Sequence, residues 1–478
     1  MKFEIAKLEA FLQDFFEKRK VPGMSVCING PEGTLYKKGF GFRDLEKEKP
    51  VDTETIFGIG SMSKSITAIC LSILESEGKF SFRDPVSKYL PALKIPGTPN
   101  EALLVHHFAN MTSGIPPLPG TFISMLAHTN FGPWIEPGLV EMGRNMVSNP
   151  ISTVEDLIEY INGSDYEPLG APGEYMSYSN DCYAMLSTIV DIVSGSTLEQ
   201  FAHDRIFEPL GMTRTTFDID EAKAMGNITS IFATNGGQLF ASDDWDVAPP
   251  YRGAGWVKST CEDMCKYYET LACDGVLRGK RVLPEGCVAR TIGHAFPETA
   301  DGIYCYGMMK RVFNGLVLHE HAGGMTGVAS MGGFFFSDGG YATTVLMNIG
   351  MSGATESGPS PVVPYLAMTN MLLGLPLKAN HVRYMPSGET PEDPKMYVGT
   401  YVSNEFFPPT EFTISKGKDG ELYVNGSKSK LLLCETTVFA LDDGTTPIDQ
   451  SLRAKFFIRG GKAWGMDIGS RMYQREED

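Results

Sequence analysis

The sequence lacks any apolar run that approaches the roughly 18 residues of a membrane span. Its first nine residues already include four charged ones, Lys2, Glu4, Lys7 and Glu9. Because a signal peptide needs an uninterrupted apolar core, this N-terminus does not resemble one. We therefore predict a cytoplasmic protein that does not contact a membrane.

Positive charge is also scarce. The 478 residues carry 41 Lys plus Arg against 58 Asp plus Glu, which gives a formal net charge of −17. Such a field repels the phosphate backbone of nucleic acids and anionic lipid headgroups. We therefore do not expect nucleic acid as a partner.

Paired cysteines are missing as well. The nine cysteines are an odd number, and no two of them have the CxxC spacing of metal and redox sites. The closest group, Cys261, Cys265 and Cys273, has no fourth ligand at a spacing that suits zinc. We expect free thiols, a reducing compartment and no metal.

Four well-known catalytic patterns do not occur either. The sequence contains no GxSxG, HExxH, Walker A or GxGxxG motif. This argues against an α/β-hydrolase, a zincin, an NTPase and a dehydrogenase, because each class depends on one of these patterns. The 42% of hydrophobic residues are enough for a sizeable core.

The pattern of residues 1–378 predicts one large domain with helices and strands. Helical spacing of apolar residues predicts a helix over 3–20, and β-type runs at 24–29 and 33–42 predict a hairpin. A further helix is expected to begin at Ser61. An antiparallel sheet is therefore expected to start near the N-terminus.

The remaining segments differ in character. Residues 95–150 and 213–255 have little periodicity, so we expect lids or binding loops there. Prolines and charges over 379–394 suit a linker. Short β-like runs with turn signals then predict a small all-β barrel or sandwich over 395–478.

The pattern Ser-x-x-Lys is a candidate nucleophile site, and one of its copies has a suitable position. The copies are Ser61/Lys64, Ser76/Lys79, Ser415/Lys418 and Ser427/Lys430. Only Ser61 begins a helix, where residues three apart share a face, so the Lys64 amine can reach the Ser61 hydroxyl. Alternatively, Ser61 is only an N-cap and Lys64 a solvated residue.

The pattern Tyr-x-Asn also recurs. The copies are Tyr160/Asn162, Tyr178/Asn180 and Tyr423/Asn425. Tyr178 and Asn180 follow a Gly- and Pro-rich loop and precede a helix, a place that presents polar groups to a cleft. A phenol beside an ammonium can act as a proton shuttle. A structural role for Tyr178 remains an equal alternative.

His-x-Gly occurs once, at His321-Ala322-Gly323, and Gly324 follows it. A Gly-rich strand edge leaves backbone N–H groups free to bind a substrate carbonyl. His319 and His321 would share one face of a strand, but no third metal ligand is nearby. We therefore favour a substrate-binding edge over a metal site.

In chain order, Ser61-x-x-Lys64, Tyr178-x-Asn180 and His321-x-Gly323 resemble the serine β-lactamase and penicillin-binding-protein superfamily, in its class C-like esterase and peptidase branch (S12-type). The likeness extends over residues 1–375. The tail from about 395 is similar to the lipocalin-like C-terminal domain of some D-amino-acid-specific peptidases, through its strand pattern and Tyr397-Val-Gly-Thr-Tyr401.

The resemblance implies an α+β fold. The large domain would be an antiparallel β-sheet flanked by helices, with a mostly helical subdomain, and a C-terminal all-β barrel would follow. Ser61 would attack the carbonyl, and Lys64 and Tyr178 would share the proton. Asn180 would orient the substrate and Lys64. The backbone N–H groups of Ser61 and of the Gly323–Gly324 segment, chiefly Gly324, would hold the oxyanion.

One departure narrows the substrate. Most β-lactamases and transpeptidases have Lys-Thr/Ser-Gly where this chain has His321-Ala-Gly, so the motif lacks the cation that grips a substrate carboxylate. We therefore expect a small-molecule or short-peptide amide or ester without that carboxylate. A substrate with a D-residue on its acyl side is the narrower expectation. No cofactor is required, and a homo-oligomer is possible. The alternatives are an acyltransferase and a non-catalytic ligand-binding protein.

Overall fold

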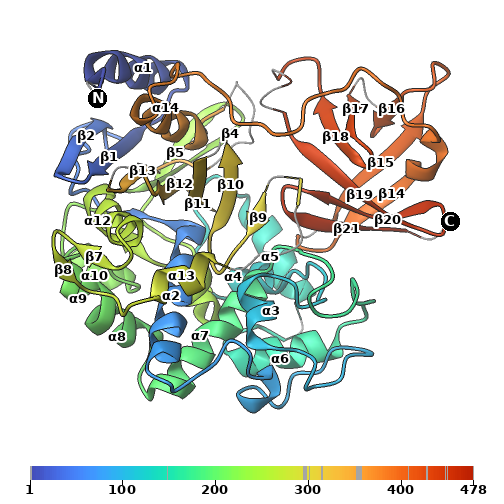
Figure 1. Cartoon of the computed structure of the whole chain (residues 1–478), viewed down its shortest axis with the longest axis horizontal. Helices are drawn as coiled ribbons and strands as arrows, with labels where there is room; N and C mark the ends of the chain where they lie inside the picture. Colours follow the sequence, from blue (N-terminus) through green and yellow to red (C-terminus); the bar gives the residue numbers. More distant parts are fainter. Residues whose placement is uncertain are drawn as a thin grey trace.

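A computed structural model of the whole chain describes residues 3–147, 149–293, 299–300, 302–313, 316–337, 339–350, 358–406, 408–426, 429–446, 448 and 451–476. Figure 1 shows a large domain that contains a sheet and most of the helices, and a separate barrel formed by the C-terminal strands. The two parts meet beside strand β9 and the helices below it.

The large domain is organised around a seven-stranded antiparallel sheet of order β2-β1-β13-β12-β11-β10-β9. The N-terminal hairpin lies beside the last strand of the sheet in sequence, with Val26 opposite Val345. This confirms the sheet predicted near the N-terminus. The strands are β1 Gly23–Gly30, β2 Gly33–Gly41, β9 Ile303–Tyr304, β10 Met309–Phe313, β11 Leu316–Met325, β12 Val328–Phe335 and β13 Tyr341–Met347.

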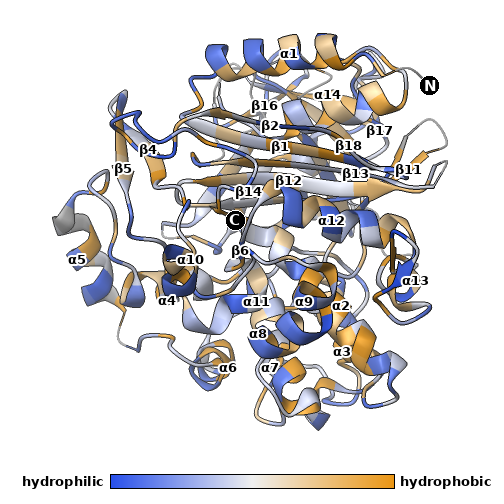
Figure 2. Ribbon diagram, turned by 90° about the vertical axis from the view of Figure 1, so that its left-hand side faces the viewer, coloured by the Kyte–Doolittle hydropathy of each residue, from blue (hydrophilic) through white to orange (hydrophobic). Residues whose placement is uncertain are grey.

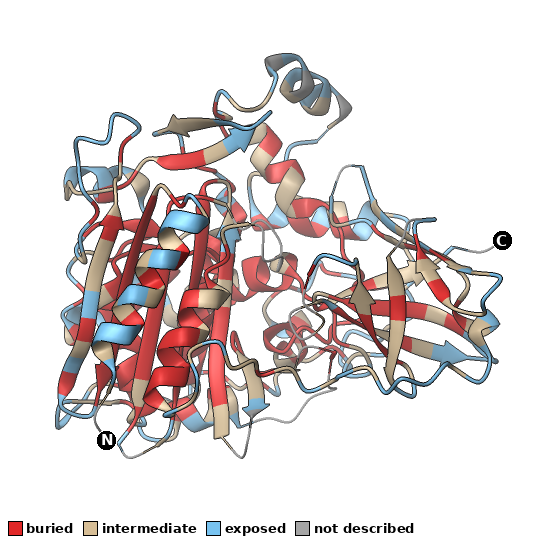
Figure 3. Ribbon diagram, turned by 90° about the horizontal axis from the view of Figure 1, so that it is seen from above, coloured by how far each residue is buried: buried red, intermediate tan, exposed pale blue. Residues whose placement is uncertain are grey.

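Helices cover both faces of this sheet (Figure 2). On one face lie α1 Ile5–Lys18 and α14 Val362–Leu372, and Leu8, Leu12 and Phe15 of α1 are buried there. On the other face lies α12 Cys261–Ala272, which separates the sheet from the helical part. The strands are therefore buried on both faces along much of their length, as Figure 3 shows.

The helical part of the large domain contains α2 and α7 at its centre, and both are almost entirely buried. The stretch 95–150, expected to be loops, contains three of its helices, and the apolar residues of the first two, α3 and α4, pack on this core. The helices are α2 Ser63–Ser76, α3 Val105–Ala109, α4 Gly120–His128, α5 Pro137–Met146, α6 Val154–Gly163, α7 Asn180–Ser194, α8 Leu198–Ala202, α9 Glu208–Leu210, α10 Ile219–Ala224, α11 Arg252–Gly255 and α13 Cys287–Ile292.

Three two-stranded sheets complete the large domain. One of them, β4-β5, is a hairpin within the stretch 213–255, where we expected a lid or binding loop. The strands are β3 Phe57–Gly58 with β6 Lys258–Ser259, β4 Ile231–Asn235 with β5 Gln238–Ser242, and β7 Val276–Leu277 with β8 Lys280–Arg281.

The C-terminal strands form a closed eight-stranded barrel. Tyr401, Phe439 and Phe456 fill its interior with edge-to-face ring contacts. The predicted barrel is confirmed, and its first and last strands, which the β-like runs did not reveal, pair to close it. The strands are β14 Gly399–Ser403, β15 Thr410–Lys416, β16 Leu422–Val424, β17 Lys430–Glu435, β18 Val438–Asp442, β19 Arg453–Arg459, β20 Lys462–Ile468 and β21 Arg471–Arg475.

Two further predictions concern the whole chain. All nine cysteines are free thiols, as expected, and seven of them are buried. Within the described residues, no helix is both long and apolar enough to cross a bilayer. The division into domain 1–378, linker 379–394 and domain 395–478 stays a proposal.

Candidate active site

Ser61 lies in a single 3-10 turn, Gly60–Met62, that leads into α2. The α-helix therefore begins two residues later than predicted, because the Ser63 hydroxyl bonds the Gly60 carbonyl and tightens this turn. Gly60 has a φ of +52°. A Cβ there would lie 2.8 Å from the backbone nitrogen of Gly324 on β11. Glycine at position 60 is thus what lets the Ser61 turn approach the strand.

Lys64 is completely buried beneath Ser61. Its Nζ donates to Asn180 Oδ1 at 2.7 Å and to the carbonyl of Ala254 at 2.6 Å, which leaves the lone pair of the neutral amine for Ser61 Oγ at 3.0 Å. No described carboxylate pairs with it. Burial, and secondarily the charge of Arg471, lower the pKa of Lys64 well below its usual value. The amine is therefore available as a neutral base one helical turn from the serine.

Tyr178 stands over the same amine, with Lys64 Nζ 4.8 Å from the centre of its ring. Its hydroxyl is buried and makes no hydrogen bond of good geometry with a described residue. Burial raises the pKa of Tyr178, although the Ser61 hydroxyl and the charge of Arg471 act in the opposite direction. A buried phenol without a partner is costly, so this hydroxyl is poised for a group that enters beside Ser61.

His321 is held by two partners on β11 and β9. Its Nδ1 lies 2.5 Å from the Ala322 carbonyl, which only accepts, so Nδ1 carries the proton and Nε2 accepts from the Tyr304 hydroxyl at 3.0 Å. Burial, with a smaller effect of Lys64, lowers the pKa of His321 to about 3. His321 is therefore a neutral ring at physiological pH, and it does not replace the cation of a Lys-Thr-Gly motif.

The edge of β11 beyond His321 faces the Ser61 turn. Strand β10 pairs with β11 only as far as Glu320, whereas β12 pairs with it up to Met325. Gly323 packs so closely on this turn that a Cβ would lie 2.1 Å from the Ile59 carbonyl. Gly324 is exposed. The predicted oxyanion residues Ser61, Gly323 and Gly324 are thus neighbours at the opening of the site.

The barrel contributes two residues that the motifs did not reveal, Arg471 and Glu405. The Arg471 guanidinium lies 4.4 Å from the centre of the Tyr178 ring. It donates to both carboxylate oxygens of Glu405, at 2.8 and 3.3 Å. A fixed cation, Arg471, is therefore present at the site, but its charge is paired with the Glu405 carboxylate.

Two hydrogen bonds, each donated by a backbone N–H group, fix the hairpin of β20 and β21 against the large domain. The Tyr178 N–H donates to the Ser470 carbonyl at 2.8 Å, and the Met472 N–H donates to the Ser177 hydroxyl at 3.2 Å. The turn between β20 and β21 has positive φ at both Gly469 and Ser470, as a two-residue hairpin of this type requires. The glycine at this turn was the only sequence signal near Arg471.

The other copies of the two motifs lie away from this centre. Lys79 and Lys430 form ion pairs with Glu77 and Glu421, and Ser427 falls outside the described residues. Asn162 bonds the backbone of residues 92 and 94.

The alternative of a metal site on β11 gains no support. Among the described residues, the only group with suitable ligand spacing is exposed and consists of His203, Asp204 and Glu208. His319 instead stacks on Phe334 with ring centres 5.2 Å apart.

Comparison with known proteins identifies the class. The Beta-lactamase family description matches residues 8–356, which is most of the chain. The chain therefore belongs to the Beta-lactamase family, whose fold supports serine hydrolases, and the resemblance inferred from the three motifs is confirmed.

Individual relatives are distant. The beta-lactamase of Escherichia coli (strain K12) is 26% identical over 254 residues, which are 53% of this chain and 57% of that protein. The octameric penicillin-binding protein homologue from Pyrococcus abyssi has 24% identity and a TM-score of 0.65, covering 98% of this chain and 99% of that one. The D-amino acid amidase from Ochrobactrum anthropi SV3 has 19% identity and a TM-score of 0.58, covering 72% and 92%.

These relatives define the fold more than the activity. The chain spans about half the length of the curated relatives it matches. The structural likenesses are below 25% identity and establish the α+β fold with its antiparallel sheet.

Proposed function

We propose that this protein is a serine hydrolase that cleaves an amide or ester bond through an acyl-Ser61 intermediate. The observation that carries the proposal is the 3.0 Å contact between Lys64 Nζ and Ser61 Oγ, made by a fully buried amine without a carboxylate partner among the described residues. An N-cap serine with a solvated lysine, the alternative for this pattern, would not bury the lysine.

The first half-reaction follows from this arrangement. Ser61 Oγ attacks the carbonyl carbon while its proton moves to the neutral Lys64 amine. Lys64 returns the proton through Tyr178 to the leaving amine or alcohol, and the carbonyl–heteroatom bond breaks. Asn180 keeps Lys64 directed at Ser61 through their 2.7 Å hydrogen bond. The oxyanion lies between the N–H groups of Ser61 and Gly324, where such donors are worth roughly 3–4 kcal/mol each.

The second half-reaction needs a water molecule that attacks the acyl group. Lys64 takes a proton from that water and returns it to Ser61 Oγ as the ester bond breaks. Arg471 acts on the base, since its positive charge favours the neutral form of Lys64. The barrel therefore forms part of the catalytic centre in this proposal.

The substrate class follows from the charges. Among the described residues near Ser61, the Arg471 cation is paired with Glu405 and His321 is neutral, so neither offers a free positive charge. Such a site disfavours the carboxylate that β-lactam substrates present and favours a neutral amide or ester. A D-residue on the acyl side, as the name of the similar D-amino acid amidase suggests, is the narrower form of this proposal.

Labelling and turnover test the proposal together. We expect a fluorophosphonate to add one adduct to the wild-type protein by intact mass spectrometry and none to Ser61→Ala. We also expect hydrolysis of p-nitrophenyl esters or D-aminoacyl anilides to exceed that of cephalosporins. Equal labelling of both proteins would remove Ser61 as the nucleophile, and faster cephalosporin hydrolysis would overturn the substrate class.

An acyltransferase is the second candidate, because the barrel hairpin at Tyr178 covers part of the site where water must enter. Product analysis with added alcohol or amine separates the two. We expect the free acid to dominate, whereas predominant transfer to the added nucleophile would favour the acyltransferase.

We also propose that the protein forms a homo-oligomer, since the similar protein from Pyrococcus abyssi is octameric. Light scattering at micromolar concentration tests this, and a mass near 52.3 kDa would contradict it. The cytoplasmic location remains a prediction.

A further inference from the structure

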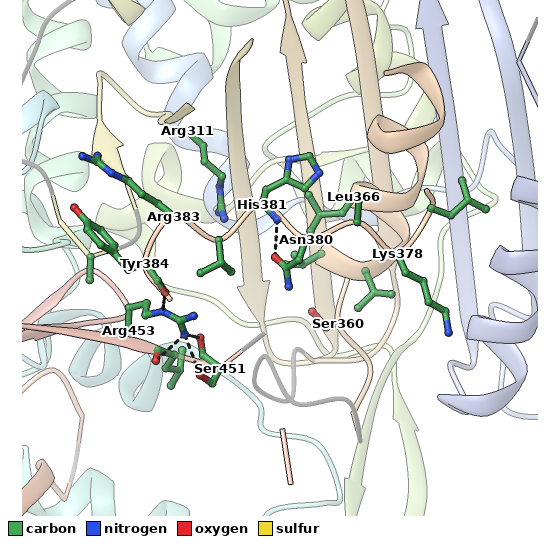
Figure 4. Close-up of a pocket in the computed structure, with 18 of the residues that line it drawn as sticks. Arg311, Ser360, Leu366, Lys378, Asn380, His381, Arg383, Tyr384, Ser451 and Arg453 are labelled. Atoms are coloured by element: carbon green, nitrogen blue, oxygen red, sulfur yellow. Dashed lines mark hydrogen bonds between the residues drawn. The ribbon is translucent and has the colours of Figure 1, made fainter. Parts of the chain in front are cut away.

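A second cavity lies at the junction of the large domain and the barrel. It has a volume of about 500 Å³ and none of the residues proposed for catalysis lines it. Its walls come from α1, the start of α14, the edge strands β9 and β10, the segment 377–384 and residues 451–453 (Figure 4). A volume of this size lies in the range of small-molecule sites.

The charge of the lining is opposite to that of the chain. Of the described residues that line the cavity, seven are basic and one, Asp14, is acidic, although the chain carries a net charge of −17. The basic ones are Lys18, Arg19, Lys310, Arg311, Lys378, Arg383 and Arg453. An acidic chain that gathers cations around one cavity creates a local field that attracts anions.

Some of these cations have structural tasks. Arg311 pairs with Glu320 at 2.9 Å. Arg453 donates to the carbonyls of Tyr384, Ser451 and Ile448, and so fastens the segment after α14 to the barrel. Figure 4 shows Arg453 directed at this backbone. These groups shape the cavity and leave little capacity for a ligand.

Three other cations have no such task. Arg19, Lys310 and Lys378 make no side-chain hydrogen bond or ion pair with any described residue, and they come from three separate elements. Like charges around one cavity repel each other unless an anion lies between them. An anion bound in this cavity would reduce the repulsion between them.

The remainder of the lining is apolar. Phe11 lies on the same face of α1 as Phe15 and Lys18, at the spacing of successive helical turns. Val363, Leu366 and other partly buried residues of α14 continue this surface. Inorganic phosphate would leave such a surface exposed to water, whereas a hydrocarbon body would cover it.

We propose that this cavity binds an amphiphilic organic anion, with an apolar body against α1 and α14 and a carboxylate or similar group in the positive field of the basic lining residues, which include Arg19, Lys310 and Lys378. The site is separate from Ser61 and does not depend on the proposed hydrolase activity. A strongly charged polyanion is disfavoured, because the rest of the surface repels it.

Decanoate is a suitable probe, and isothermal titration calorimetry measures its binding. We expect decanoate to bind the wild-type protein at one site, decanol to bind at least about tenfold more weakly, and 10 mM phosphate not to displace decanoate. The variant R19Q/K310Q/K378Q should bind decanoate at least about tenfold more weakly. Absence of decanoate binding, equal affinity for decanol, or displacement by phosphate would each overturn the proposal.

A matched control removes the same charge elsewhere. Lys47, Lys223 and Lys280 are exposed, unpaired among the described residues and outside the cavity. The variant K47Q/K223Q/K280Q should bind decanoate as the wild type does. If it bound decanoate as weakly as R19Q/K310Q/K378Q, the loss would come from net charge alone and the proposed site would be wrong.

A substitution that fills the cavity with a larger side chain tests where decanoate binds. Val363→Trp should abolish decanoate binding while fluorophosphonate labelling of Ser61 and the circular dichroism spectrum stay unchanged. Decanoate binding that survives Val363→Trp in the folded protein would place the ligand elsewhere and overturn the proposal.

Discussion

The large domain and the barrel both contribute to the surroundings of Tyr178, but they do so by different means. Ser61 and Lys64 are three residues apart, so a single helical turn fixes their 3.0 Å contact. Arg471 and Glu405 are 66 residues apart and meet only because the barrel closes. The large domain thus supplies chemistry encoded locally, whereas the barrel supplies an electrostatic setting that depends on its complete fold.

The two regions also differ in how they handle charge. The Lys64 amine has only neutral oxygen partners, so no described carboxylate pairs with it to offset the effect of burial, and the neutral amine is favoured. The Arg471 cation is neutralised by a bidentate carboxylate, which suits a fixed structural charge. The proposed base, Lys64, therefore has neutral partners, whereas the positioning cation, Arg471, has a carboxylate partner.

The largest effect is expected from Ser61→Ala. Loss of the attacking oxygen should lower kcat/KM for a p-nitrophenyl ester by about 10⁴-fold or more, with an unchanged circular dichroism spectrum. A loss of less than tenfold would mean that the chemistry of the large domain lies elsewhere.

The next largest effect is expected from Tyr178→Phe. It removes only the unpartnered hydroxyl and keeps the ring between Lys64 and Arg471. We expect kcat to fall by about 10²–10⁴-fold, as for loss of a general acid or base. Stopped-flow acylation kinetics measure this, and an unchanged kcat would leave Tyr178 with a structural role.

The barrel pair should shift the pH profile in opposite directions. Positive charge at Arg471 lowers the pKa of Lys64 and negative charge at Glu405 raises it. Because the neutral amine is the active form, Arg471→Gln should move the acidic limb of kcat/KM to higher pH, on the order of one pH unit. Glu405→Gln should move the limb to lower pH.

The double variant R471Q/E405Q is the control for this experiment. It removes both charges together and avoids leaving one partly buried charge unpaired, which is strongly destabilising. Its acidic limb should lie between those of the single variants. Shifts in the same direction for both single variants would show that the barrel acts through packing and not through charge.

The smallest effect is expected from His321→Asn. Because burial keeps the pKa of His321 at about 3, its ring stays neutral throughout the pH range in which activity would be assayed. We expect a loss of less than about tenfold in kcat, and no limb of the wild-type profile near pH 6.5. Nitrogen NMR shifts of the imidazole that titrate near pH 6.5 would contradict this.

Much of the proposed site was predictable because its residues are local. The Ser61/Lys64 spacing, the Tyr178/Asn180 loop and the His321 strand edge each occupy a few residues. In the structure all of them meet at the start of α2. The fold class and the barrel followed from periodicity and resemblance in the same way.

The remaining features depend on contacts between distant segments. Tyr304 lies in a strand of two residues, too short for any periodic signal, yet its hydroxyl is the partner of His321 Nε2. Strands β14 and β21, at the two ends of the barrel sequence, pair with each other only when the barrel closes. Helices α3 and α4 within 95–150 are short and are stabilised by packing on α7, a tertiary contact that helix propensity does not reveal.

The turn at Gly469 and Ser470 has a consequence for biosynthesis. Ser61 leaves the ribosome some 400 residues before this turn does. Until β14 and β21 pair, Ser61, the proposed nucleophile, exists without Arg471 beside Tyr178. A nascent chain would therefore hold an incomplete centre, and maturation of its reactivity would be coupled to the last folding event of the barrel.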